Sequence, residues 1–111
     1  MPFFRFHFVE KARLAEISEK MTDQLQAAMG CPREHIVLEV IHADVVEHSK
    51  GAIMSSWPFV AVEYFERPRE VQHKVAAILH DCLTLIGYVD SDIHFFYLQP
   101  ENYYENGKCM E

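Results

Sequence analysis

The residue with the most distinctive chemistry in the sequence is Pro2, which directly follows Met1. If Met1 is removed, the nitrogen of Pro2 becomes the free amine of the chain. An α-amino group has an ordinary pKa of about 8, and burial or a nearby cation lowers it, so this amine can act as a base near neutral pH. A purely structural interpretation is also open, because proline is tolerated at the first residue of a strand.

Basic side chains gather at two places, Lys11 with Arg13 and Arg67 with Arg69. Arginine binds both oxygens of a carboxylate at once, and a cation beside the Pro2 amine would help to keep that amine neutral. We therefore predict that Lys11, Arg67 and Arg69 are candidates for binding a small carboxylate-bearing molecule. Solvated residues at the starts of two helices are the alternative, although a helix N-terminus disfavours cations.

Seven histidines raise the question of a metal site. His42, Asp44, Glu47 and His48 lie close in sequence, but their spacing matches no familiar ligand set and neighbouring strand residues point to opposite faces. We predict neither a metal site nor a cofactor. His94 is a candidate substrate-binding residue because imidazole titrates near neutral pH. The alternative for His94 is a hydrogen-bonded structural role.

Composition narrows the classes of partner. The 111 residues are half hydrophobic, which predicts one domain over 1–111. Acidic residues outnumber basic ones, 17 to 10, and no basic stripe suits nucleic acid. Without an apolar run of about 18 residues or a signal peptide pattern, we expect no membrane partner and a cytoplasmic location. The three cysteines lack a Cys-x-x-Cys spacing, so we expect reduced thiols.

The elements that position the candidate residues follow from the apolar pattern. Runs rich in β-branched and aromatic residues predict four strands, at 2–8, 35–42, 58–65 and 92–98. Within each half, the segment between the two strands has apolar residues at three- and four-residue spacing, which is typical of a helix with one buried face. Gly30 and Gly87 follow these segments and are expected to end the helices.

Two segments lack a core pattern of their own. Residues 43–57 are predicted to form turns around a possible short strand. Residues 101–111 contain Tyr103, Tyr104 and an Asn106-Gly107 pair, which favours a tight hairpin turn. Because this tail has no core, its tyrosines need a surface to cover, and that surface could belong to a neighbouring subunit.

The two halves of the chain repeat each other. Pro2-Phe3 and Pro58-Phe59 open them, and a glycine ends the helix of each. We divide the chain into repeat one (2–44), repeat two (58–100) and a C-terminal tail (101–111). A strand-helix-strand unit normally forms a parallel strand pair through a right-handed crossover. The prediction is an α+β fold with a tandem β-α-β repeat, forming a four-stranded mixed sheet with two helices on one face.

One chain would leave the second face of this sheet bare. We assign Phe3, Val37, Phe59 and Phe95 to that face, and together they are too apolar to leave in water. Since the pattern contains no further helix, another copy of the chain is the expected cover.

This arrangement resembles the tautomerase superfamily, whose members include 4-oxalocrotonate tautomerase and macrophage migration inhibitory factor. The resemblance runs over nearly the whole chain. Within the superfamily, the chain most resembles a small uncharacterised bacterial family, which is similar to it in length and in the tail with Tyr103, Tyr104 and Asn106-Gly107. The stretches that carry the resemblance are Pro2-Phe3-Phe4, residues 30–37, residues 40–44, Ser55-Ser56-Trp57-Pro58 and residues 92–97.

The resemblance implies a homotrimer with pockets between adjacent subunits. It implies that Pro2 moves a proton between the carbon and oxygen ends of a keto–enol pair, here on a small enolisable 2-oxo acid. Lys11, Arg67 and Arg69 lie at the strand-to-helix junctions where related enzymes carry basic residues. The implied activity is that of a tautomerase, an isomerase that uses no cofactor.

Departures from the superfamily pattern support a second hypothesis. Cys31, His94 and Phe96 stand where the cytokine-like members have a lysine, a tyrosine and an asparagine. The paired thiols of those members are also missing, so no redox activity is expected. These differences favour a non-catalytic trimeric binding or interaction protein of the same fold.

Overall fold

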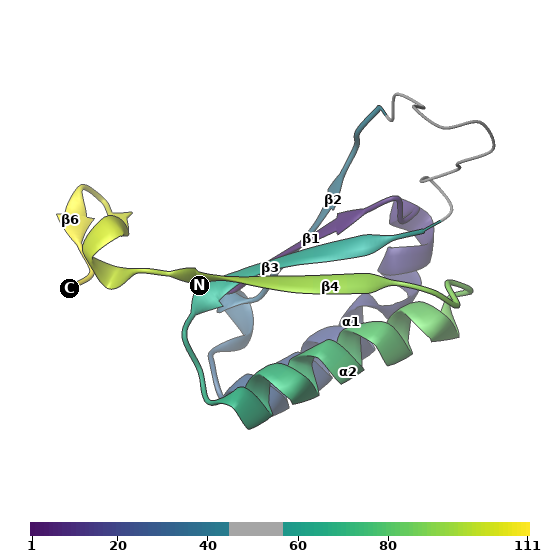
Figure 1. Cartoon of the computed structure of the whole chain (residues 1–111), viewed down its shortest axis with the longest axis horizontal. Helices are drawn as coiled ribbons and strands as arrows, with labels where there is room; N and C mark the ends of the chain where they lie inside the picture. The colour runs from purple at the N-terminus through teal and green to yellow at the C-terminus, as the bar shows by residue number, and fades with distance from the viewer. Residues whose placement is uncertain (45–56) are drawn as a thin grey trace.

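Two long helices pack on one face of a four-stranded sheet in the computed structural model, which describes residues 1–44 and 57–111 (Figure 1). The possible short strand expected within 43–57 falls almost entirely on residues outside these ranges. Each half of the chain has the predicted order of strand, helix and strand: β1 (Phe3–His7), α1 (Lys11–Met29) and β2 (Val37–Ile41), then β3 (Phe59–Phe65), α2 (Arg69–Leu85) and β4 (Asp92–Leu98).

The sheet has the strand order β2-β1-β3-β4. The two strands within each half are parallel, as the β-α-β repeat predicts. The central strands β1 and β3 come from different halves and are antiparallel, with Phe3 opposite Glu63. The start of β1 therefore lies beside the end of β3, where the chain turns into α2.

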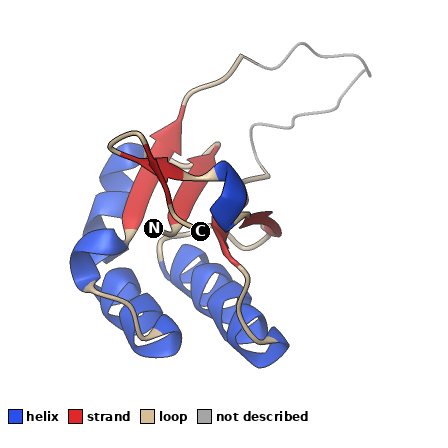
Figure 2. Cartoon of the chain, turned by 90° about the vertical axis from the view of Figure 1, so that its left-hand side faces the viewer, coloured by secondary structure: helices blue, strands red, loops and turns tan. Residues whose placement is uncertain are grey.

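The core lies between the sheet and the helices, both of which cover the same face (Figure 2). Burial alternates along β1 and β3 because successive strand residues point to opposite faces. A fully buried side chain of this kind contributes about 1.5–3 kcal/mol of stability. The buried apolar residues of these elements are Phe4, Phe6, Val60, Val62 and Tyr64 from the sheet, Leu14, Ile17, Met21 and Leu25 from α1, and Val75, Leu79, Cys82 and Leu83 from α2. Neither helix is apolar enough over a sufficient length to cross a membrane.

The opposite face of the sheet carries a mixture of charged and aromatic side chains. Arg5 is at its centre and forms ion pairs with Glu63 and, at 3.3 Å between Nε and Oε1, with Glu39. Nearby, the rings of His7 and Phe59 stack with their centroids 4.2 Å apart. Burial lowers the pKa of His7, and the charge of His94 lowers it further. This face is less apolar than the sequence predicts, but it still presents several rings to solvent.

The assignment of Phe95 to this second face is wrong. Phe95 pairs with Val62, a core residue, and packs against the core beneath the helices. Its neighbour Phe96 lies on the second face instead and is 58% exposed. A shift of one residue moves a strand side chain to the other side of the sheet, and two adjacent phenylalanines conceal that shift in the sequence.

The C-terminal tail forms the predicted hairpin and extends beyond one end of the sheet (Figure 1). A short 3₁₀ turn, η3 (Pro100–Asn102), leads into strands β5 (Tyr104–Glu105) and β6 (Lys108–Cys109). The Asn106-Gly107 turn has positive φ angles of 51° and 78°, as a type I′ hairpin turn requires. Tyr103 packs edge-on against Phe65 of β3, with the ring centroids 5.4 Å apart. Tyr104 is 64% exposed, so its own chain gives it little to cover.

Candidate active site

Pro2 is fully buried at the start of β1. Its carbonyl oxygen accepts a hydrogen bond from the backbone N–H of Val37 at 3.2 Å, which begins the ladder between β1 and β2. Phe4 pairs with Val62 on the helix side of the sheet, so Pro2 and Tyr64, one step further along that face, are cross-strand neighbours. While Met1 is attached, the nitrogen of Pro2 is an amide nitrogen and cannot act as a base.

The start of the chain lies in an environment that favours a neutral amine. Burial lowers the pKa of the terminal amine, here carried by Met1, and the positive charge of Arg67 lowers it further. The nearby Cys31 and Glu105 act in the opposite direction and are weaker. Because the antiparallel pairing of β1 and β3 brings the end of β3 beside the chain start, Arg67 lies close to the amine of Met1, although the two residues are far apart in the sequence.

Arg67 is held in the connection between β3 and α2. Its Nη1 donates a hydrogen bond to the carbonyl oxygen of Phe65 at 3.0 Å. Its guanidinium carbon lies 4.7 Å from the centroid of the Tyr64 ring, within the range of a cation–π contact. The side chain is half-buried, so part of it is left to meet a ligand.

The other predicted site residues are divided between different parts of the chain. Arg69 is exposed at the first position of α2, near Arg67. Lys11 begins α1 after the far end of β1, and there it borders a hollow of about 350 Å³ together with His42. His94 pairs with Ala61 on the face opposite the helices, 5.9 Å from Phe59 between ring centroids. Within one chain, Arg67 therefore lies close to the chain start and Arg69 follows it at the start of α2, whereas Lys11 and His94 lie elsewhere.

Tyr64 is a candidate site residue that the sequence did not single out. Its side chain is fully buried, and its hydroxyl is the one buried side-chain oxygen or nitrogen in the described ranges without a hydrogen-bond partner. An unsatisfied buried hydroxyl costs about 1–3 kcal/mol. Burial raises the pKa of Tyr64, with a smaller contribution from Tyr97, while the charge of Arg67 opposes the rise. The phenol is therefore neutral near physiological pH and available as a donor.

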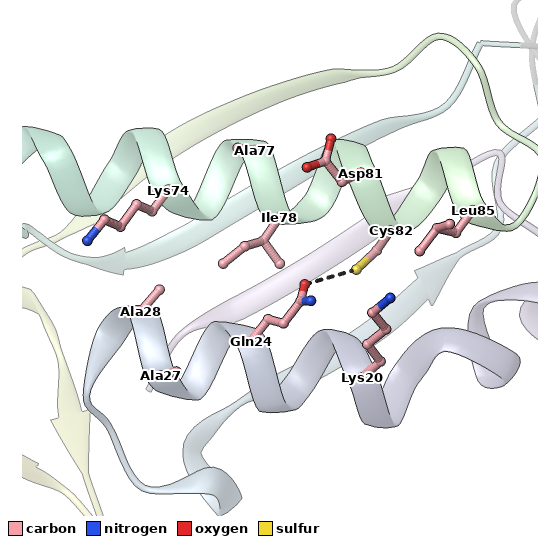
Figure 3. Close-up of a pocket in the computed structure, with 10 residues that line it drawn as sticks. All are labelled: Lys20, Gln24, Ala27, Ala28, Lys74, Ala77, Ile78, Asp81, Cys82 and Leu85. Carbon is pink, nitrogen blue, oxygen red and sulfur yellow. Dashed lines mark hydrogen bonds between the residues drawn. The ribbon is translucent and has the colours of Figure 1, made fainter.

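Two hollows outside the core bear on where a ligand could bind. One of about 300 Å³ lies at the chain start and is bordered by Met1, His35 and residues of the C-terminal tail. A larger groove of about 690 Å³ runs between the two helices and is lined by residues of α1 and α2 alone (Figure 3). In that groove Cys82 Sγ donates a hydrogen bond to Gln24 Oε1 at 3.6 Å. None of the predicted site residues lines either hollow, but the one at the chain start borders Met1, the residue directly before Pro2.

The sequence cluster of histidines and acids is only partly described. Glu47 and His48 lie outside the described residues. Within 1–44 and 57–111, no three His, Cys, Asp or Glu side chains are grouped closely enough to hold a metal ion.

A comparison with known protein families shows which family the chain belongs to. A model of the family DUF1904, described as a domain of unknown function, matches residues 1–109. The chain belongs to the DUF1904 family. A search of curated proteins found no match for it. A crystal structure of a DUF1904 domain from Sebaldella termitidis ATCC 33386 is similar to this DUF1904 chain, with a TM-score of 0.85 and 25% identity, covering 98% of this chain and 99% of that one.

Two further solved structures relate the DUF1904 fold to enzymes. Fused 4-OT, described as a wild-type asymmetric trimer, has a TM-score of 0.79 at 13% identity and covers 97% of this chain and 95% of its own. FG41 malonate semialdehyde decarboxylase, inhibited by 3-bromopropiolate, has a TM-score of 0.68 at 17% identity and covers 92% and 87%. At these identities the likeness shows the fold alone. It confirms the tautomerase-like arrangement that the sequence predicts.

Proposed function

We propose that this DUF1904 protein is a keto–enol tautomerase that acts on a small enolisable 2-oxo acid, with Pro2 as general acid and base after removal of Met1. The observation that carries the proposal is the chain start, where burial and then the charge of Arg67 lower the pKa of the amine that Met1 carries. We expect both causes to act in the same direction on the amine of Pro2 once Met1 is removed. An amine with a lowered pKa is neutral at working pH and can accept a proton. The fold shared with fused 4-OT supports the same activity.

In the proposed reaction, the neutral Pro2 nitrogen takes a proton from the carbon beside the carbonyl. The electron pair of the broken C–H bond forms the carbon–carbon double bond, and the carbonyl π pair moves onto oxygen. The protonated Pro2 then gives its proton to that oxygen, which produces the enol and restores the neutral amine. Arg67, assisted by Arg69, binds the carboxylate of the substrate and fixes its distance from Pro2.

We infer that the working form is a homotrimer with pockets between adjacent subunits. Lys11 and His94 lie away from Pro2 within one chain, so they reach a Pro2 site only from a neighbouring copy. The exposed Phe96 and Tyr104 are apolar surfaces that such a neighbour would cover. The free thiols of Cys31, Cys82 and Cys109 fit the reducing cytoplasm, where we place the protein.

The amine itself gives the sharpest test of this function. We would produce one protein with a free Pro2 and a second with the same sequence behind a short uncleaved N-terminal extension, and follow the keto–enol conversion of phenylpyruvate by absorbance. The free form is expected to be at least 100-fold faster, because the extension converts the amine into an amide. Equal rates from two folded samples would rule out Pro2 as the base.

The alternative function is a non-catalytic trimeric binding or interaction protein. The position of His94 favours it, because this residue lies on the face of the sheet opposite Tyr64 rather than beside Pro2. This alternative predicts that the free-Pro2 form converts none of a panel of enols and 2-oxo acids. Turnover that disappears with the extended N-terminus would exclude it.

A further inference from the structure

The hydroxyl of Tyr64 is a buried polar group that the packing of the core does not require. The other helix-facing residues of β3, Val60 and Val62, are apolar, and a phenylalanine would fill the Tyr64 ring position without leaving a hydroxyl unpaired. Buried polar groups in folded proteins are almost always hydrogen-bonded. An oxygen from a bound molecule is therefore a natural partner for this donor.

The surroundings of Tyr64 show which oxygen it could meet. Pro2 is its cross-strand neighbour on the helix side of the sheet, and such neighbours have Cβ atoms about 4.5–5.5 Å apart. The guanidinium of Arg67 lies over its ring at 4.7 Å. The start of β1, the Tyr64 side chain and the Arg67 guanidinium thus lie at one end of the sheet. Once Pro2 carries a free amine, these are the groups that a 2-oxo acid would use.

The hydroxyl of the neighbouring tyrosine, Tyr97, already has a hydrogen-bond partner. Tyr97 stacks beside Tyr64 with the ring centroids 6.3 Å apart, and its hydroxyl donates to Gln72 Oε1 at 2.6 Å. Of this pair of adjacent phenols, only that of Tyr64 lacks a partner. Tyr97 therefore provides a matched control with the same chemistry and almost the same place in the fold.

We propose that the Tyr64 hydroxyl donates a hydrogen bond to the carbonyl oxygen of the 2-oxo acid while Arg67 holds its carboxylate. This inference rests on the proposed function and adds a residue to it. As Pro2 removes the proton from the adjacent carbon, negative charge develops on that oxygen. A preorganised donor aimed at such an oxygen contributes about 100- to 1000-fold to kcat in enzymes that use one. Met1 precedes Pro2 directly, so its removal is the step expected to open this end of the sheet to substrate.

The kinetic test compares Tyr64→Phe and Tyr97→Phe in protein with a free Pro2. With phenylpyruvate as substrate, Tyr64→Phe should lower kcat about 100-fold and leave KM within a few-fold, because the lost bond is strongest in the transition state. Tyr97→Phe should change kcat less than threefold. Thermal unfolding should show no loss of stability in Tyr64→Phe, since the variant removes an unsatisfied buried hydroxyl. Equal kcat values for Tyr64→Phe and the wild type would overturn the inference.

A binding measurement separates this inference from the proposed function. Benzoylformate is a 2-oxo acid with no proton to lose beside its carbonyl, so it can bind but cannot tautomerise. Calorimetry should give a Kd a few-fold weaker for Tyr64→Phe than for the wild type, with Tyr97→Phe unchanged. That result without any turnover of phenylpyruvate would support the Tyr64 contact and refute the tautomerase function. Identical Kd values, or no binding by the wild type, would refute the Tyr64 contact, while turnover lost with a blocked Pro2 would still support the tautomerase.

Discussion

The starts of β1 and β3 have the same backbone geometry but different chemical surroundings. Pro2 and Pro58 are both fully buried, and each carbonyl accepts a hydrogen bond from the parallel neighbouring strand, from Val37 at 3.2 Å and from Asp92 at 3.1 Å. Opposite Pro2 lies Tyr64, with Arg67 above its ring. Near Pro58, β1 has already ended: its last residue, His7, pairs with Phe59, and the next residue, Phe8, has a positive φ of 62°.

This comparison separates the structural role of the proline from a chemical one. Pro58 shows that a strand of this repeat begins with a buried proline for reasons of geometry alone, because its nitrogen is always part of a peptide bond. Only Pro2 can carry a free amine, and the titratable and cationic groups that affect an amine are gathered at its end of the sheet. Pro2 is therefore the residue to test for a chemical role, and Pro58 is its structural control in the same molecule.

The largest effect is expected from replacing Pro2 with alanine, with the same replacement of Pro58 as the control. In protein without Met1, Pro2→Ala should lower kcat for phenylpyruvate by at least 100-fold, because it replaces the secondary amine that serves as acid and base. Pro58→Ala should leave kcat within threefold and act on stability instead. Steady-state kinetics and thermal unfolding of both variants measure the difference. A similar loss of kcat in both would show that the prolines act only through the fold.

Removing the guanidinium beside Pro2 is expected to have the next largest effect. Arg67→Ala should raise KM about 10- to 100-fold, since hydrogen bonds to charged groups are worth about 1.5–3 kcal/mol. Arg67→Lys should recover only part of the loss because lysine lacks the planar fork. Arg33→Ala is the matched control, as it removes a cation from an exposed ion pair with Asp23. An unchanged KM in Arg67→Ala would remove this residue from the site.

The same Arg67 variant has a defined effect on pH dependence. After burial, the charge of Arg67 is the second cause that lowers the pKa of the amine carried by Met1. We expect the same charge to lower the pKa of the Pro2 amine, so its removal should raise that pKa. A base must be neutral to act, and activity therefore rises as pH increases through its pKa. The acidic limb of the kcat/KM profile should move to higher pH in Arg67→Ala and stay in place in Arg33→Ala. A shift to lower pH would contradict the assignment of that limb to the amine.

A smaller effect, a threefold change in the mass of the assembly, should show whether subunits meet through the second face of the sheet or through the helices. Phe96 is 58% exposed on the second face of the sheet, and Leu85 is 61% exposed on the helices. Phe96→Glu should convert a trimer into a monomer because it places a charge in the proposed interface, whereas Leu85→Glu should not. Light scattering coupled to gel filtration measures both masses. Dissociation by Leu85→Glu alone would place the interface on the helices.

The smallest predicted effects compare the helix ends of the two repeats. Gly30 has φ 66° with open space where a Cβ would lie, whereas Gly87 has φ 101° and a Cβ there would lie 3.3 Å from Arg13 Nη1. Gly30→Ala should cost about 1 kcal/mol and Gly87→Ala about 2 kcal/mol, because the second position adds crowding to an unfavourable φ. Denaturant unfolding at one protein concentration gives both values. The reverse order would show that Arg13 moves aside easily.

Much of this fold could be predicted from the sequence because its signals are local and occur twice. Apolar spacing located both helices, and β-branched runs located the four strands that form the sheet. The repeated Pro-Phe starts then predicted the two parallel pairs. The face of Phe95 was mistaken because side-chain direction depends on register, and Phe95-Phe96 fits either register equally well.

The candidate site could be predicted only in part, because it depends on contacts between the halves. The sequence places Lys11 and Arg67 at equivalent strand-to-helix junctions, but antiparallel pairing of β1 and β3 sends these junctions to opposite ends of the sheet. Tyr64 looks like any core aromatic residue in the sequence. Its missing hydrogen-bond partner, which makes it distinctive, is visible only once the surrounding atoms are placed.

The central claim, that Pro2 supplies a free catalytic amine which Pro58 cannot, depends on removal of Met1. Intact-mass spectrometry of the untagged protein, isolated from the cells that make it, tests this claim most directly. We predict the mass of residues 2–111 with no modification at the new N-terminus. A mass that includes Met1 throughout the native material would contradict the claim, because the nitrogen of Pro2 would then be an amide.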